Sequence, residues 1–202
     1  MDIYDKLVNG GMGVNFIAKN GLGETVMDCF ESKKSNDISL YPVYNEGKGG
    51  YIDKTGREVA PCQYDIANDF SEGLAVVVKS FKCGFIDKTG REVIPRKYVF
   101  ANDFHEGMAV VEKNGKDGYI DKTGREVIPC KYDETYIFRE GMGVVEMNGK
   151  RGYIDKTGRE VAPCEYDDAN DFHEGLAKVK KAGKYGFIDK TGREVVPFIY
   201  DE

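Results

Sequence analysis

The 202-residue sequence contains no tryptophan, only two histidines and no apolar run near the ~18 residues that a membrane-spanning helix needs. Its first residues lack the basic and then apolar segments of a signal peptide. We therefore expect a cytoplasmic protein without a membrane partner. Asp and Glu (35) outnumber Lys and Arg (29), for a net charge of −6. This leaves no basic surplus for a nucleic-acid backbone, so nucleic acid is not expected as a partner.

The sequence also lacks the short motifs of common enzyme classes, such as a Gly-rich phosphate loop, HExxH, or ordered Ser, His and Asp residues. We therefore expect neither catalysis nor a cofactor. A site formed between units around Cys83, His105 or His173 stays open as an alternative. Acidic residues in the connections do not follow EF-hand spacing, so calcium or another metal is not expected.

Five cysteines, an odd number without a CxxC pair, favour a reducing compartment over a disulfide framework. Cys62, Cys130 and Cys164 occupy one position of a repeated pattern, in "PCQYD", "PCKYD" and "PCEYD". Equivalent positions of successive units are at least one repeat apart, too far for a disulfide. We therefore expect these cysteines to be small packing residues.

The octapeptide "IDKTGREV" begins at residues 52, 86, 120, 154 and 188, a period of 34. Helical repeats share this period, so the residue types must decide. In Gly107–Asp133, "MAVVEK" and "GYID" are rich in β-branched and aromatic residues and are joined by an Asn-Gly hairpin signal. A proline follows the octapeptide in each unit, which argues against a helix. Each unit is therefore predicted to be a three-stranded antiparallel meander.

The segment "DKTGRE" predicts a tight turn whose Gly adopts a left-handed conformation, at Gly56 and its four equivalents. The turn places Asp53 opposite Arg57 as a cross-strand pair. Five copies of one constellation favour a structural role for the octapeptide over a catalytic one.

The connections read "CxYDxANDFxEG" and its variants. Their aromatic residues are expected to form the contacts between neighbouring units; they are Tyr64, Phe70, Tyr98, Phe104, Tyr132, Phe138, Tyr166 and Phe172. His105 and His173 occupy a position that holds Ser71 or Arg139 in other units, which is typical of a surface site.

The chain divides into residues 1–39, predicted to be a degenerate N-terminal capping repeat, and residues 40–202, five tandem repeats of which the last is truncated. It starts and ends at the same phase of the repeat, at "IYD". This phase suits an open curved or superhelical array and also a closed propeller-like ring. Three short strands per 34 residues are few for a propeller blade, so we expect an all-β protein with an open array.

The pattern "NGKxGYIDKTGREVIPxxYDxAxxFxEGxAxV" over residues 40–202 is similar to that of the bacterial WG (KWG) repeat family. In that family the residue before the Gly of "GYID" is typically Trp. Here the position holds Gly49, Cys83, Asp117, Arg151 and Tyr185. The resemblance implies a repeat module that binds other macromolecules.

Because the units share a frame and differ at few positions, we expect a scaffold for protein–protein interaction. Its predicted contacts are the variable positions Cys83, Asp117, Arg151 and Tyr185, together with His105 and His173. The expected partner is another protein, and the sequence leaves the oligomeric state open. The alternative is a cell-wall or glycan-binding module, because "NGKxGYI" resembles choline-binding hairpins with aromatic platforms.

Overall fold

The computed structural model describes residues 39–201, and the structural statements below concern these residues. They form β-strands and turns, and no helix long and apolar enough to cross a membrane occurs among them. The predicted capping repeat, apart from Ser39, lies outside the described residues.

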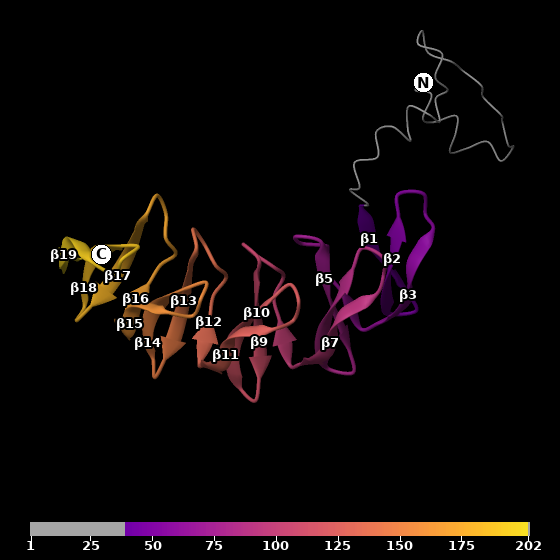
Figure 1. Cartoon of the computed structure of the whole chain (residues 1–202), viewed down its shortest axis with the longest axis horizontal. Helices are drawn as coiled ribbons and strands as arrows, with labels where there is room; N and C mark the ends of the chain where they lie inside the picture. Colours follow the sequence, from indigo (N-terminus) through magenta and orange to yellow (C-terminus); the bar gives the residue numbers. More distant parts are fainter. Residues whose placement is uncertain (1–38, 202) are drawn as a thin grey trace, which may run out of the picture. The chain divides into compact units, whose positions relative to one another are not determined.

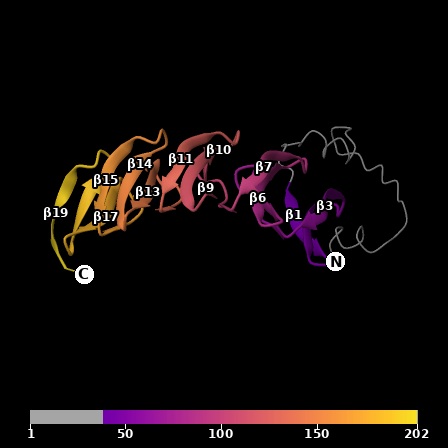
Figure 2. The ribbon, with the colours of Figure 1, turned by 90° about the horizontal axis from the view of Figure 1, so that it is seen from below.

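The strands form five antiparallel sheets, called sheets 1 to 5 in chain order. Figures 1 and 2 show them following one another from β1 to β19. Sheet 1 consists of β1 (Leu40–Asn45), β2 (Lys48–Asp53) and β3 (Glu58–Tyr64). Sheet 2 consists of β4 (Ile66–Ala67), β5 (Leu74–Lys79), β6 (Lys82–Asp87) and β7 (Glu92–Tyr98). Sheet 3 consists of β8 (Phe100–Ala101), β9 (Met108–Lys113), β10 (Lys116–Asp121) and β11 (Glu126–Tyr132).

Sheet 4 consists of β12 (Glu134–Thr135), β13 (Met142–Met147), β14 (Lys150–Asp155) and β15 (Glu160–Tyr166). Sheet 5 consists of β16 (Asp168–Ala169), β17 (Leu176–Lys181), β18 (Lys184–Asp189) and β19 (Glu194–Tyr200). None of these sheets closes into a barrel, and the expected all-β open array of tandem repeats is confirmed.

The predicted three-stranded meander is present in every sheet, and sheets 2 to 5 carry one strand more. This strand, β4, β8, β12 or β16, is two residues long and pairs with the first long strand of its sheet. It comes from the connection, where the sequence analysis predicted no strand. Two residues are too few to show the alternation by which a strand is recognised in a sequence.

The two-residue hairpin turn is confirmed by its backbone angles. Asn114 and Gly115 have φ of 56° and 72°, and Asn148 and Gly149 have 55° and 72°. Asn and Gly tolerate this left-handed conformation, which matches the twist of the flanking strands.

The "DKTG" turn is confirmed in all five units, and the carboxylate of its Asp organises it. In sheet 3, one oxygen of Asp121 accepts hydrogen bonds from the backbone N–H of Thr123 (2.9 Å), from the Thr123 hydroxyl (2.5 Å) and from the backbone N–H of Arg125 (3.2 Å). The other oxygen pairs with Nε of Arg125 at 3.0 Å. Gly124 has φ of 80° and donates its N–H to the Asp121 carbonyl. The predicted cross-strand Asp–Arg pair therefore forms.

The Gly of "GYID" faces a bulge at the Pro of the third long strand. Between Asp117↔Tyr132 and Tyr119↔Ile128 the register shifts. A Cβ on Gly118 would lie 2.5 Å from the Ile128 carbonyl oxygen and 2.7 Å from the backbone nitrogen of Cys130. Only glycine fits here, and the bulge accommodates a Pro without a backbone donor.

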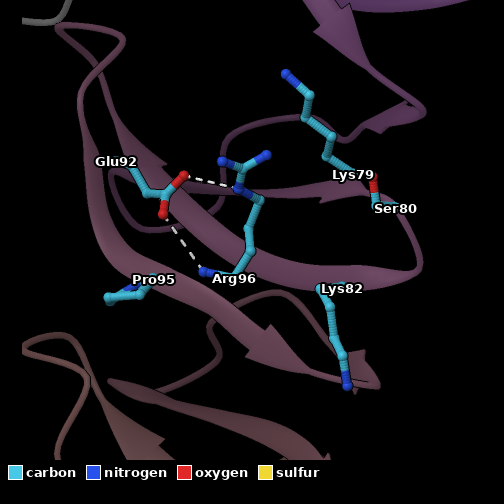
Figure 3. Close-up of a pocket in the computed structure, with 6 residues that line it drawn as sticks. All are labelled: Lys79, Ser80, Lys82, Glu92, Pro95 and Arg96. Carbon is cyan, nitrogen blue, oxygen red and sulfur yellow. Dashed lines mark hydrogen bonds and ion pairs between the residues drawn. The ribbon is translucent and has the colours of Figure 1, made fainter.

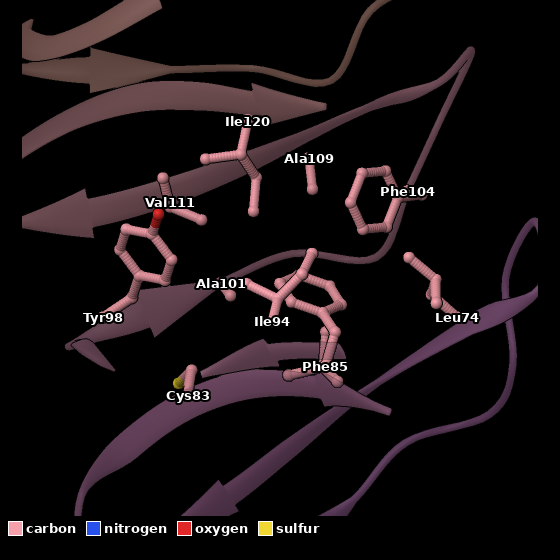
Figure 4. Close-up of a cluster of buried hydrophobic side chains, with 11 residues drawn as sticks. Leu74, Cys83, Phe85, Ile94, Tyr98, Ala101, Phe104, Ala109, Val111 and Ile120 are labelled. Atoms are coloured by element: carbon pink, nitrogen blue, oxygen red, sulfur yellow. The ribbon is translucent and has the colours of Figure 1, made fainter. Parts of the chain in front are cut away.

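Each sheet contacts its neighbours through two faces, and we call the contact between consecutive sheets a joint. The face toward the next sheet is the forward face and the other is the back face. In the joint of sheets 2 and 3, Phe85, Ile94 and Tyr98 of the forward face form one buried cluster with Val111 and Ile120 of the back face (Figure 4). Phe104 of the connection joins this cluster. The predicted contacts between units through Tyr and Phe are confirmed.

An ionic staple crosses three joints. Oε2 of Glu72 accepts the backbone N–H of Gly107 (3.0 Å) and pairs with Lys122 (3.0 Å), both in the next unit. Glu106 does the same with Gly141 and Lys156. Glu140 repeats the arrangement with Gly175 and Lys190. The Lys of the octapeptide therefore connects one unit to the preceding one.

We expect Gly→Ala substitutions in the "DKTG" turns to differ in their cost to stability, depending on the atoms that lie beside each glycine. Ala at Gly56 meets no described atom within 4 Å and should cost only the left-handed conformation, about 1–2 kcal/mol. Ala at Gly90 would in addition place its Cβ 2.6 Å from the Val59 carbonyl oxygen of the preceding sheet. Urea denaturation should therefore show a larger loss of unfolding free energy for Gly90→Ala. Equal losses would contradict the close approach of sheets 1 and 2.

The Asp-centred turns should make the protein acid-sensitive. The Thr157 hydroxyl, with the Arg159 side chain, lowers the pKa of Asp155 to about 2, and the pKa of Asp189 is held at about 2 by Thr191 in the same way. A carboxylate with a depressed pKa in the folded state stabilises it above the unfolded pKa of about 4, and this is lost as pH falls toward 2. Unfolding free energy should therefore decline between these pH values, and less so in Asp155→Asn. A flat profile would refute the prediction.

Candidate interaction surface

The predicted binding positions of "GYID" are occupied by contacts within the chain. In sheet 3, Asp117 accepts the backbone N–H of Thr135 at 3.1 Å, and burial raises its pKa. In sheet 4, Arg151 pairs with Glu146 and Asp168 and stacks over the Tyr136 ring, 5.2 Å from its centroid. These residues link their sheet to the short strand that follows or to the preceding connection.

The other two predicted positions, Cys83 and Tyr185, also make contacts within the chain. Cys83 is buried, its Sγ is 3.5 Å from the Val99 carbonyl oxygen, and burial raises the pKa of its thiol. Tyr185 lies under the ammonium groups of Lys178 and Lys180, at 4.0 and 5.0 Å from its ring centroid. A binding role for the four positions stays a prediction. Cys83, Asp117 and Arg151 contact the connection or strand that follows their sheet, whereas Tyr185 contacts lysines of its own sheet.

The two histidines are exposed and lie in different units. His105 pairs through its backbone with Met108 before sheet 3, and His173 pairs with Leu176 before sheet 5. Sheet 4 separates the two segments in the chain order of the array. The structure therefore does not gather the histidines into one constellation.

A hollow of about 420 Å³ lies on sheet 2 and is lined by Lys79, Ser80, Lys82, Glu92, Pro95 and Arg96 (Figure 3). Arg96 is bound to Glu92, with Nε to Oε2 at 2.8 Å, and Lys79 donates to Gln63. The Lys79 and Lys82 side chains extend in opposite directions, and the Lys82 ammonium points away from the Arg96 guanidinium (Figure 3). The cations do not converge, so the hollow is poorly built for a small anion.

The hairpin end of each joint has a carboxylate clamp with one exception. Asp65 pairs with Lys48 of sheet 1 at 2.6 Å and accepts the Ser80 backbone N–H of sheet 2 at 2.7 Å. Asp133 makes the same two contacts with Lys116 and Asn148. Asp167 pairs with Lys150 and accepts the backbone N–H of Gly183, the second residue of its turn. In the joint of sheets 2 and 3 the equivalent residue is Val99, which is 51% exposed. Within the described residues, Lys82 has no carboxylate partner.

Phe81 departs most from the repeat. It occupies the second position of the hairpin turn of sheet 2, where the other four turns have Gly, and its φ is 60°. A left-handed conformation is unusual for a bulky residue. Its side chain is 90% exposed, so no packing within the described residues compensates for it.

We call Phe81, Lys82, Val99 and Phe100 the hairpin-end patch, because Phe81 and Lys82 lie at the hairpin turn of sheet 2 and Val99 and Phe100 follow its last strand, where the clamp residue stands in other joints. Phe100 is also exposed. The sequence analysis did not predict this patch, because it took the variable residues before the Gly of "GYID" and the two histidines as the binding positions. Two signals were available: "SFK" replaces the Asn-Gly type of turn, and "YVF" replaces "YD".

Comparison with known families identifies the repeat. A family model described as "WG containing repeat" matches residues 50–80, 84–116, 118–150, 152–185 and 185–202. The chain belongs to the WG-containing repeat family. The first four matched segments begin in the second long strand of one sheet and run into the next sheet, and the fifth, 185–202, lies in sheet 5. Each of the first four WG repeats therefore spans a joint, and the sheet and the sequence unit are out of phase.

Solved structures resemble the chain at low sequence identity, and no curated protein matches it. A crystal structure of a eukaryotic initiation factor is 11% identical with a TM-score of 0.53, over 83% of this chain and 54% of that one. Hsv2 of Kluyveromyces lactis is 9% identical with a TM-score of 0.47, over 78% of this chain and 58% of that one. The WG-repeat chain thus spans little more than half the length of either structure. The likeness to the initiation factor concerns the fold alone.

Replacing Phe81 with Gly should stabilise this WG-repeat protein. Gly adopts the left-handed conformation without the penalty that a Cβ imposes, so we expect a gain of about 1 kcal/mol in unfolding free energy by urea denaturation. Phe81→Ala is the matched control, because it removes the ring and keeps the Cβ, and it should give little gain. A loss of stability in Phe81→Gly would mean that the ring supports the fold.

Proposed function

We propose that the protein is a non-catalytic repeat scaffold that binds another protein through the hairpin-end patch. The observation that carries this proposal is Phe81, an exposed aromatic side chain in a strained turn. Backbone strain and apolar exposure that do not help the fold point to a functional constraint. Aromatic residues are also the side chains most often central to protein interfaces.

The charges at the patch indicate the chemistry of the partner. Lys82 has no described carboxylate partner, since Val99 replaces the Asp that pairs with the corresponding Lys in other joints. A partner carboxylate beside an aromatic or aliphatic anchor would complement Lys82 and cover Phe81, Val99 and Phe100. We infer a segment of this kind, apolar with an adjacent Asp or Glu, as the bound element.

The scaffold explains why the patch is at a joint. Sheets 2 and 3 are held by their buried cluster and by the staple of Glu72, so the missing clamp at Val99 leaves the joint intact. The hairpin end of this joint is thus available for a partner, while the staple of Glu72 and the buried cluster hold sheets 2 and 3 together. The frame supports a rigid site, which reduces the entropy lost on binding.

A peptide-display experiment with counter-selection tests the proposal. Random peptides are selected on the wild-type protein after depletion on Phe81→Gly, and we expect enrichment of apolar sequences containing Asp or Glu. These peptides should bind Phe81→Gly and Lys82→Glu at least about tenfold more weakly, a difference of about 1.4 kcal/mol. Ile66→Ser is the matched control, because Ile66 is the exposed equivalent of Phe100 in the preceding unit, and it should retain binding.

Peptides that bind all variants equally would refute the patch as the site. The glycan alternative is tested on the same proteins with glycan arrays and purified cell walls. Binding there that is indifferent to Phe81→Gly, with no peptide selected, would favour the cell-wall function over the protein scaffold.

A further inference from the structure

The forward face of sheet 5 has the composition of a buried face and is exposed. Tyr200 is 53% exposed, whereas its equivalents are at most 4% exposed; these are Tyr64, Tyr98, Tyr132 and Tyr166. Leu176 is 37% exposed, whereas Leu74 and Met108 at the same repeat position are buried. The face therefore has the side chains of a joint but no described sheet against it.

The back face of sheet 1 is the counterpart at the other end of the described array. Tyr41 is 52% exposed, whereas Ala75, Ala109 and Ala177 at the same position are at most 1% exposed. Val43 and Ile52 occupy positions that hold buried Val and Ile residues in later sheets. Among the described residues, no sheet lies against the face of sheet 1 that corresponds to the one sheets 2 to 5 bury in their joints.

The ionic staple is also incomplete at both ends. Glu174 stands at the position of Glu72, Glu106 and Glu140, and its carboxylate has no partner among the described residues. Lys54 stands at the position of the three lysines that bind those carboxylates, and it likewise has no described ion pair. Within residues 39–201, one end thus has an acceptor without its lysine and the other a lysine without its carboxylate.

We propose that a second copy of this chain docks the back face of its sheet 1 on the forward face of sheet 5. The proposal rests on the continuity of the joint geometry and on charge complementarity. A copy placed as the next sheet of the array brings its Lys54 to Glu174, as Lys190 is brought to Glu140.

Two substitutions at these faces match each other. Lys178 replaces the buried Val of the forward face, as at Val144, and Tyr41 replaces the buried Ala of the back face, as at Ala177. In the joint of sheets 4 and 5, Val144 and Ala177 belong to one cluster, so Lys178 would meet the Tyr41 ring of the second copy. A lysine over an aromatic face is favourable, and Lys178 already makes such a contact with Tyr185.

The association is heterologous, so each copy of a pair keeps one face free, and the pair as a whole still offers one free forward face and one free back face. Such contacts extend into longer assemblies or close into rings. A lysine in the contact makes this joint weaker than the apolar joints within the chain, so assembly should be reversible and concentration-dependent. The faces are distinct from the hairpin-end patch, and the inference does not depend on the proposed function.

Sedimentation analysis of the full chain over micromolar to millimolar concentrations tests the proposal. We expect the mean mass to rise with concentration, and Glu174→Lys or Lys54→Glu to weaken association about tenfold each. Carrying both reversals in one chain should restore it, because the two exchanged charges then meet across the contact with their signs reversed. Mixing the two single variants should restore pairing as well.

Glu160→Lys is the matched control, since it changes the net charge by the same amount on an exposed strand residue and should leave association unchanged. A monomer at every concentration would overturn the proposal, and would mean that another part of the chain or another molecule covers these faces. Equal weakening by all charge changes, without restoration in the double variant, would also overturn it.

Discussion

Every sheet of this protein has two apolar faces, and the contact between consecutive sheets is the interaction on which the rest depends. A small twisted sheet of three or four strands cannot bury both faces alone. The joints solve this problem because a forward face with large side chains meets a back face with small or branched ones. In the joint of sheets 4 and 5, Tyr153 and Tyr166 lie with Ala177 and Val179. The alternation of large and small side chains lets the backbones approach closely.

This close approach explains why the octapeptide is repeated so faithfully within the chain. Its Asp, Thr and Arg form the turn of their own sheet, as in Asp121, Thr123 and Arg125. Its Gly both adopts a left-handed conformation and lies against the preceding sheet, since a Cβ on Gly192 would be 2.4 Å from the Val161 carbonyl oxygen. Its Lys reaches the Glu of the preceding unit. Local turn formation and the joint between units therefore use the same eight residues.

Turns and long strands could be predicted because their signals are local. An Asn-Gly pair or a Lys-Thr-Gly segment determines the backbone within a few residues, and the structure follows both. The staple was not predicted, because Glu72 and Lys122 are 50 residues apart and meet only when two units stack. The two-residue strands were not predicted for a related reason, since they depend on contacts with other parts of the chain. Thr135 of β12 pairs with Val145 and donates its backbone N–H to the Asp117 carboxylate.

The positions where units differ serve the array in another way. Five nearly identical units present the hazard that a strand pairs with the wrong neighbour. Arg151 bound between Tyr136 and Asp168 belongs to one joint only, and Asp117 with Thr135 belongs to another. An exchange of units would separate these groups and leave a half-buried charge without its partner, which is unfavourable. Asp117 and Arg151, which stand at the Trp position of the WG repeat, thus disfavour an exchange of units. The side chains of Phe81 and Val99 form no such pair with a described residue and are exposed, so they are available for contacts outside the chain.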